Sequence, residues 1–175
     1  MTRILKSSSS RPFWRLTQRE QTVVIVFFAF LLVGAWLPSR ITVATSGSLD
    51  HRVFYLLPAP AKVELGNYLV FPRRDLSQVQ HGFRAEHDQM IKLVGCLPGE
   101  QLTTDETHSF TCNGRSLGQA LEVDSKGRPL PRFSFNGPVP ADKLFMVGTH
   151  PRSYDSKYFG FIDAHEIRHQ ALPLW

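Results

Sequence analysis

A run of residues without charge near the N-terminus constrains this chain most. From Gln21 to Ser39 the sequence carries no charged side chain, and most of the run is apolar. A helix needs about 17–25 such residues to cross the hydrocarbon core of a membrane, so the run lies at the short end of that range. Trp14 and Trp36 flank it, as aromatic residues do at membrane interfaces. We therefore predict a transmembrane signal anchor over residues 22–38.

Two other interpretations of this run remain open. A cleaved signal peptide would also be short, although Ala-Trp-Leu-Pro-Ser at the end of the run is a poor small-residue cleavage site. A buried core helix would show a polar face, and none interrupts the run. Residues 1–21 hold five basic side chains against one acidic side chain. By the positive-inside rule, this basic tail predicts a cytoplasmic N-terminus and an extracytoplasmic domain over residues 39–175, in the periplasm of a bacterium.

The positive charge is confined to this tail. The tail accounts for four units of the net charge of +5, so about +1 remains for the rest of the chain. No basic stripe interleaved with aromatic residues follows, and such a stripe is typical of nucleic-acid binders. Hydrophobic residues make up 42% of the sequence, which is enough for a packed core. We expect no nucleic-acid partner, and a lipid bilayer as one partner.

Short β-prone segments separated by turn residues fill the rest of the sequence. Apart from the anchor, no long segment has a helical period. The segment 101–140 is rich in turn residues and is interpreted as a cap or insertion. We predict a mainly β domain of antiparallel sheets or a partial barrel. The predicted strands are residues 41–44, 52–57, 63–71 with a turn or bulge at Gly66-Asn67, 90–96, 110–112, 132–135, 143–148 and 158–162.

The two cysteines, Cys96 and Cys112, would lie in an oxidising compartment if this orientation holds. A bridge between them would close a 16-residue separation and contribute about 3 kcal/mol in the chain-entropy model. We predict that bridge, and two reduced, buried thiols are the alternative.

A lysine within an apolar strand is the first candidate for chemistry. Met90, Lys92 and Val94 would share one face of the predicted strand. Most lysines in strands point to solvent. If this face is the inner one, however, burial disfavours the ammonium, lowers the lysine pKa and leaves an amine that accepts a proton from a serine. The candidate nucleophile is Ser48, which follows Leu37 so closely that it must lie within about 36 Å of the anchor. Such a Ser-Lys pair is a known variant of the nucleophile-base arrangement.

Four segments together resemble the conserved boxes of type I signal peptidases. They occur in the family's order, after the expected anchor: Ser46-Gly47-Ser48, Gly66–Phe71, Lys92–Glu100 and Gly148–Gly160. The resemblance covers residues 43–175 and implies a sheet domain of the signal-peptidase type. It also implies that Ser48 is the nucleophile, Lys92 the general base and Ser46 a donor to the oxyanion. Two supporting roles follow in the last box, where Ser153 would orient the lysine amine and Asp155 would brace the site.

The sequence also departs from the family pattern. Asp50 follows the second serine where proline is usual, and it would hold Lys92 charged if the two came close. Leu93 and Lys157 replace arginines, Asn67 replaces an aspartate, and the cap is short. Compact forms of this kind resemble the conjugative-transfer, TraF-type branch, whose members mature pilin subunits and in some cases join their ends into a circle.

A rival motif lies near the end of the sequence. His165-Glu166-Ile167-Arg168-His169 fits the H-E-x-x-H pattern, in which two histidines one helical turn apart bind zinc. No Cys, His, Asp or Glu follows His169 to supply a third ligand. We therefore predict no metal and no cofactor, and we keep a zinc peptidase only as a third hypothesis.

The sequence thus predicts a membrane-anchored serine endopeptidase that removes leader peptides from exported preproteins. The expected substrate is conjugative prepilin, with pilin cyclisation as a variant of the reaction, and other conjugation or secretion components are expected partners. The alternative is a catalytically inactive, membrane-tethered β-domain that scaffolds an envelope or pilus assembly. The sequence leaves open the substrate, the choice between hydrolysis and cyclisation, and the oligomeric state.

Overall fold

The computed structural model describes residues 17–36, 40–72 and 89–175. Its contacts divide the chain into two units, Met1–Arg40 and Ile41–Trp175. The expectation of a polar loop or short helix over residues 82–89 falls outside the described residues except for Gln89, which begins a strand. The basic tail over residues 1–21 also lies largely outside them.

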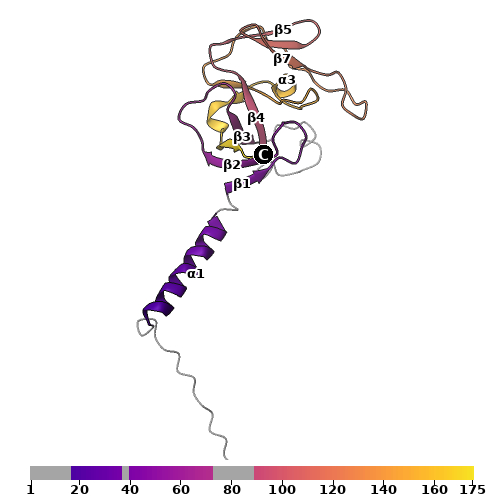
Figure 1. Cartoon of the computed structure of the whole chain (residues 1–175). Coiled ribbons are helices and arrows are strands. Elements are labelled where there is room, and N and C mark those ends of the chain that lie inside the picture. The colour runs from indigo at the N-terminus through magenta and orange to yellow at the C-terminus, as the bar shows by residue number, and fades with distance from the viewer. Residues whose placement is uncertain (1–16, 37–39, 73–88) are drawn as a thin grey trace, which may run out of the picture. The chain divides into compact units, whose positions relative to one another are not determined.

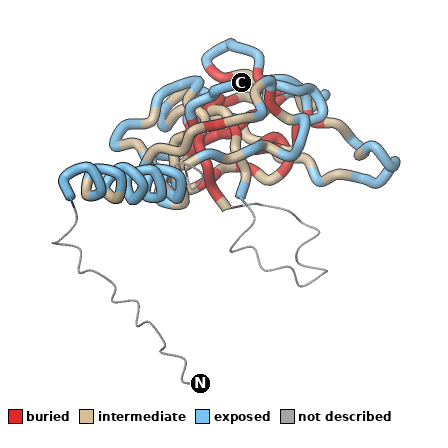
Figure 2. The backbone as a smooth tube through the Cα atoms, turned by 60° about the horizontal axis from the view of Figure 1, so that its bottom comes forward, coloured by how far each residue is buried: buried red, intermediate tan, exposed pale blue. Residues whose placement is uncertain are grey.

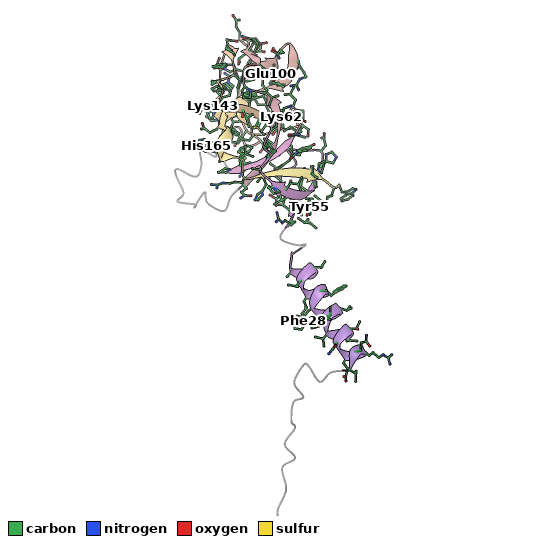
Figure 3. The ribbon with its side chains drawn as sticks, turned by 90° about the vertical axis from the view of Figure 1, so that its left-hand side faces the viewer. Phe28, Tyr55, Lys62, Glu100, Lys143 and His165 are labelled. Atoms are coloured by element: carbon green, nitrogen blue, oxygen red, sulfur yellow. A yellow bond between two sulfur atoms is a disulfide. The ribbon has the colours of Figure 1, made fainter. Side chains whose placement is uncertain are left out.

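The first unit contains the apolar helix α1, Gln18–Trp36 (Figure 1). Thr17 and Glu20 form a capping box, because the Glu20 carboxylate accepts from the Thr17 N–H at 2.8 Å and the Thr17 hydroxyl accepts from the Glu20 N–H at 3.4 Å. This cap starts the helix four residues before the predicted anchor. The span Gln18–Ala35 has a mean hydropathy of 1.4 and is long enough to cross a membrane, a test that a signal sequence also passes. Its apolar residues are mostly exposed (Figure 2), and the Phe28 side chain points away from the helix axis (Figure 3).

The second unit is built on a seven-stranded antiparallel sheet. Its order is β1-β2-β11-β3-β4-β9-β10, so a strand from late in the sequence, β11, lies between β2 and β3. The apolar run Tyr68–Phe71 lies within this sheet, and Leu69, Val70 and Phe71 are each at most 2% exposed. The strands are β1 Ile41–Val43, β2 Val53–Pro58, β3 Tyr68–Pro72, β4 Gln89–Cys96, β9 Lys143–Val147, β10 Ile162–Asp163 and β11 His169–Pro173.

A second, four-stranded antiparallel sheet falls within the segment predicted as a cap. Its order is β7-β6-β5-β8, with β5 Gln101–Thr104, β6 Ser109–Cys112, β7 Arg115–Gln119 and β8 Gly137–Pro138. A tight Asn113-Gly114 turn joins β6 and β7, and both residues have positive φ, as hairpin turns of this kind require. Figure 1 shows β5 and β7 at the end of the domain opposite β1 and β2. The mainly β, antiparallel fold predicted from the sequence is confirmed.

Three apolar clusters form the core, which Figure 2 shows in red between the exposed loops. The largest lies under the smaller sheet, where Leu102 and Phe110 pack with Phe145 of the larger sheet. The Phe110 and Phe145 rings stack with centroids 5.3 Å apart. The disulfide between Cys96 and Cys112 lies in the same cluster and joins the end of β4 to β6, with Cα atoms 5.7 Å apart. The two sheets therefore share one core and one covalent link.

Two predicted strands were wrong. Residues 132–135 are not a strand, because Thr104 bonds the Phe135 backbone and the Phe133 and Phe135 rings stack in parallel at 6.3 Å. Residues 158–162 form the end of helix α3, Ser156–Phe159, and the start of β10. Asp155 caps α3 by accepting the Lys157 N–H, and this cap outweighs the β-prone composition that follows. The third strand begins at Tyr68 and not at Val63.

Candidate active site

The segment Ser46-Gly47-Ser48 lies in the turn between β1 and β2. Ser48 is half-buried, and its carbonyl accepts hydrogen bonds from the Thr149 N–H at 3.1 Å and the His150 N–H at 3.3 Å. These bonds fasten the turn to the loop after β9. The Ser48 side chain is thereby held at the junction of two loops and not at a mobile tip.

Lys92 lies in the middle of β4 and points to the inner side of the sheet. Its side chain is 3% exposed, so the solvent-facing alternative for this lysine is excluded. The ammonium nitrogen Nζ lies 2.7 Å from the Ser48 Oγ and 2.9 Å from the Ser153 Oγ. The structure thus brings together three residues separated by 44 and 61 positions in the sequence.

A further hydroxyl extends this set. The Ser46 Oγ lies 3.0 Å from the Ser48 Oγ, and Ser46 is the more exposed of the two. The order of contacts is therefore Ser46, Ser48, Lys92 and Ser153, from the surface inward. A nucleophile in hydrogen-bond reach of a base, with a third group on that base, is the arrangement that activates a serine.

Gly148 permits this close approach and was not singled out by the sequence. A Cβ atom at Gly148 would lie 2.0 Å from the Ser153 Oγ and 2.7 Å from the Ser48 carbonyl oxygen. Any side chain there would push the two serines away from Lys92. The only signal in the sequence is the position of Gly148 at the start of the last box, next to an apolar strand.

Asp155 and Lys157 form a buried ion pair beside these residues. Asp155 is 0% exposed and Lys157 2%, and the Lys157 Nζ lies 2.7 Å from an Asp155 carboxylate oxygen. The same carboxylate accepts the Gly148 N–H at 2.9 Å and the Lys157 N–H at 3.1 Å. Asp155 therefore connects the start of α3 to the loop that touches Ser48. The sequence predicted the carboxylate as a brace, but not that Lys157 would be its partner.

Asp50, which replaces the proline that is usual in the family, lies beside an aromatic residue. Asp50 is exposed and lies beside Tyr68, whose hydroxyl is 3.2 Å from the His51 Nδ1. Burial, and after it the charge of Asp50, raise the pKa of the Tyr68 phenol.

The H-E-x-x-H segment does not form a zinc-binding helix. Its first part is the short 3-10 helix η3, Ala164–Glu166, and His169 begins β11. Glu166 accepts the Asp163 N–H at 3.2 Å, and the His169 Nδ1 lies 3.2 Å from the Leu57 carbonyl oxygen. His165, labelled in Figure 3, is exposed. The two histidines therefore do not share one helical face. Elsewhere among the described residues, Cys96, Glu100 and Cys112 come close enough to suggest a metal site, but the two sulfurs are joined in the disulfide.

A cleft of about 690 Å³ opens onto Ser48 and Lys92. Its walls come from the β1–β2 turn, the first half of β4, the loop after β9 and the hairpin near residue 128. The cleft belongs entirely to the second unit. A chain segment lying in it would therefore pass directly over the Ser48 hydroxyl and the Lys92 amine.

Comparison with known proteins gives the following matches. A family model described as "Signal peptidase, peptidase S26" matches residues 16–175. The "Plasmid transfer protein TraF" of Escherichia coli is 26% identical over 153 residues, which cover 79% of this chain and 85% of that protein. The "Conjugal transfer protein TraF" of Agrobacterium fabrum (strain C58 / ATCC 33970) is 31% identical over 86 residues, which cover 49% of this chain and 48% of that protein.

Proposed function

We propose the following function because the chain belongs to the signal peptidase family, peptidase S26. The resemblance predicted from the sequence boxes is thereby confirmed, and the named relatives associate this signal-peptidase-like protein with conjugation. On this premise the chain is a serine endopeptidase that removes leader peptides from exported preproteins, in particular a conjugative prepilin. The observation that carries the proposal is the 2.7 Å contact between the Ser48 Oγ and the buried Lys92 Nζ.

Lys92 acts as the general base in this mechanism. In its unprotonated form the buried amine, 2.7 Å from the Ser48 Oγ, takes the hydroxyl proton of Ser48. The Ser48 oxygen then attacks the carbonyl carbon of the scissile peptide bond. Ser153, 2.9 Å from the same nitrogen, keeps the amine directed at Ser48. Because a lysine amine can rotate, a second hydrogen-bond partner is needed to hold it in the orientation that reaches Ser48.

The negative charge that develops on the carbonyl oxygen needs donors close to Ser48. The Ser48 backbone N–H and the Ser46 hydroxyl, which lies 3.0 Å from the Ser48 Oγ, are the proposed donors. One such donor contributes about 3 kcal/mol to transition-state stabilisation. Lys92 returns the proton to the leaving amine, which yields an ester between Ser48 and the substrate. Water resolves this ester in a hydrolase, and a peptide amine resolves it in a cyclisation.

The substrate binds as an extended strand along β4. Residues Gln89–Lys92 pair with β3 on one side, whereas the pairing of β4 with β9 begins only at Leu93. Within the described ranges, no strand pairs with the other side of Gln89–Lys92, and these residues line the cleft. A peptide added there would use the unpaired backbone groups of β4 and bring its scissile bond to Ser48.

Exposed apolar side chains on the larger sheet suit a lipid surface. Strands β1 and β11, which flank β2, present Ile41, Val43 and Leu172, which are 40%, 59% and 41% exposed. Leu174 and Trp175 follow β11, and Trp175 is 84% exposed. Exposed tryptophan and leucine favour the interface of a bilayer. This supports a domain that works beside the membrane on its periplasmic side, with α1 as the anchor and the N-terminus in the cytoplasm.

The decisive experiment compares the full chain with two variants on a prepilin or preprotein substrate. Ser48→Ala and Lys92→Ala should each reduce cleavage by about 10⁴-fold or more, because the nucleophile or its base is lost. Ser125→Ala and Lys126→Ala, exposed positions outside the cleft, are the matched controls. Mass spectrometry of the product distinguishes addition of water from cyclisation, and a chelator should have no effect.

Two outcomes would contradict the proposal. Normal processing by either site variant would remove the dyad from the mechanism. A wild-type chain that binds prepilin but never cleaves or cyclises it would be the tethered scaffold and not an enzyme.

A further inference from the structure

Besides neutral polar residues, the cleft is lined by an apolar set and a cationic set. The apolar set includes Val43, Ala44, Leu56, Val70 and Ile91, which suits the small, apolar side chains near a leader cleavage site. Besides Lys92, the cationic set consists of two arginines, with a histidine beside them. Among the described residues, no aspartate or glutamate lines the cleft. The lining is therefore positive, although the domain beyond the basic tail is nearly neutral.

Arg128 is held in a fixed position at the rim of the cleft. Its Nε donates to an Asp124 carboxylate oxygen at 2.7 Å, and the same aspartate accepts the Lys126 N–H and the Arg128 N–H at 2.8 and 2.9 Å. These bonds, led by that of the Arg128 backbone N–H, lower the pKa of Asp124. A guanidinium has five N–H donors in a planar fork, so the bond from Nε leaves the terminal nitrogens able to bind another group. The hairpin therefore orients Arg128 and does not use up its donors.

Arg152 lies next to the reacting groups in the loop after β9. Its neighbour Ser153 contacts Lys92, and its own N–H donates to the His150 Nδ1 at 3.1 Å. His150 in turn donates its backbone N–H to the Ser48 carbonyl. Arg152 is exposed and lines the cleft, so its guanidinium extends from the loop that fastens the nucleophile.

We propose that Arg152 and Arg128 bind a carboxylate of the substrate within a few residues of the scissile bond. The inference rests on the proposed peptidase function and adds the substrate class, a peptide that carries an acidic group beside its cleavage site. The planar fork of arginine matches a carboxylate through two parallel hydrogen bonds. Two sources have this chemistry: the side chain of an aspartate or glutamate, and the α-carboxylate at the end of a peptide.

The test uses the full chain in detergent and labelled peptides that contain an Ala-x-Ala cleavage sequence. One series exchanges Glu for Gln at each position near the scissile bond, and a second exchanges a C-terminal acid for an amide. The wild type should prefer the acidic member by about fivefold in kcat/KM, the upper range for partly exposed ion pairs. The preference should shrink as the ionic strength rises. The series that shows the preference identifies the source of the carboxylate.

Variants of the arginines show whether they cause the preference. Arg152→Gln combined with Arg128→Gln should bring the ratio to about one, and Arg152→Glu should invert it in favour of a lysine-containing peptide. Lys126→Gln, on the same hairpin but outside the cleft, should keep the wild-type ratio. Thermal unfolding of each variant shows that the fold is retained.

Binding to Ser48→Ala separates this inference from the proposed activity. Acid-selective binding without any cleavage by the wild type would support the carboxylate site and contradict the peptidase. Cleavage without acid preference at low salt, or a preference that survives loss of both arginines, would overturn the carboxylate site and leave the peptidase intact. Failure of Ser48→Ala to distinguish acidic from neutral peptides would also overturn it.

Discussion

Two lysines are buried in the second unit, and their surroundings differ. Lys92 is 3% exposed and contacts two serine hydroxyls, whereas Lys157 is 2% exposed and contacts the Asp155 carboxylate. A carboxylate in contact favours the charged form of a buried lysine, and burial disfavours that form elsewhere. Lys157 therefore forms a buried ion pair that connects two loops, whereas the Lys92 Nζ lies against the Ser48 hydroxyl that it would deprotonate in the proposed mechanism. Burial alone does not identify a general base, because the role of a buried lysine also depends on the groups that its amine contacts.

Replacing each lysine with methionine should separate the two roles. These two variants should show the largest effects of the series. Lys92→Met should reduce peptide cleavage by about 10⁴-fold, because no base remains, while the free energy of unfolding changes by less than about 1.5 kcal/mol. Lys157→Met should cost about 3–5 kcal/mol of stability, because Asp155 is left buried without its partner charge. Urea unfolding and cleavage assays on both variants measure the contrast. Equal losses of activity and stability in the two variants would show that the lysines share one structural role.

Ser153→Ala sharpens the comparison by removing one of the two hydroxyls from Lys92. Loss of one hydrogen bond to the amine should lower kcat by about tenfold, since about 1.4 kcal/mol of orientation is lost. KM should stay unchanged, because Ser153 is buried and contacts Lys92 and not the substrate. Steady-state kinetics separate the two parameters. An increase in KM at constant kcat would place Ser153 in substrate binding instead.

An exposed lysine completes the series with the smallest effect. Lys62, labelled in Figure 3, pairs with Glu64 at 3.5 Å, and both side chains are mostly exposed, at 85% and 64%. Lys62→Met should change the free energy of unfolding by less than about 0.5 kcal/mol and leave cleavage at the wild-type rate. The same unfolding and cleavage assays apply. A loss comparable with that of Lys157→Met would show that burial does not distinguish these lysines.

Much of the site could be predicted from the sequence, but only where a short segment contains a recognisable motif. The order of the boxes predicted that Ser48, Lys92 and Ser153 would meet, and the structure brings all three within hydrogen-bond distance. Their catalytic roles stay predictions until the variants are tested. The cysteine pair was predicted from its compartment, and it is bridged.

Other features depend on contacts that no local pattern contains. The cap of Asp155 and its ion pair with Lys157 stabilise α3, which takes the first residues of the predicted strand 158–162, because a cap and a buried ion pair outweigh composition. The approach of Ser153 to Gly148 depends on how two loops pack, and a glycine in the sequence does not indicate which residues will pack against it. Residues 132–135 alternate polar and aromatic residues as a strand does, but the Phe133 N–H donates to the Lys157 carbonyl and the Phe135 N–H to the Thr104 hydroxyl, so they do not pair with a neighbouring strand.

The position of β11 has a consequence for biogenesis. Its residues 169–173 insert between β2 and β3, both of which end before residue 73. The larger sheet cannot close until those late residues have left the ribosome and, in the proposed topology, have crossed the membrane. Until then β2 and β3 present open edges on which foreign strands could pair. In the proposed topology, the cleft can therefore form only after the domain has been translocated, and not during translocation.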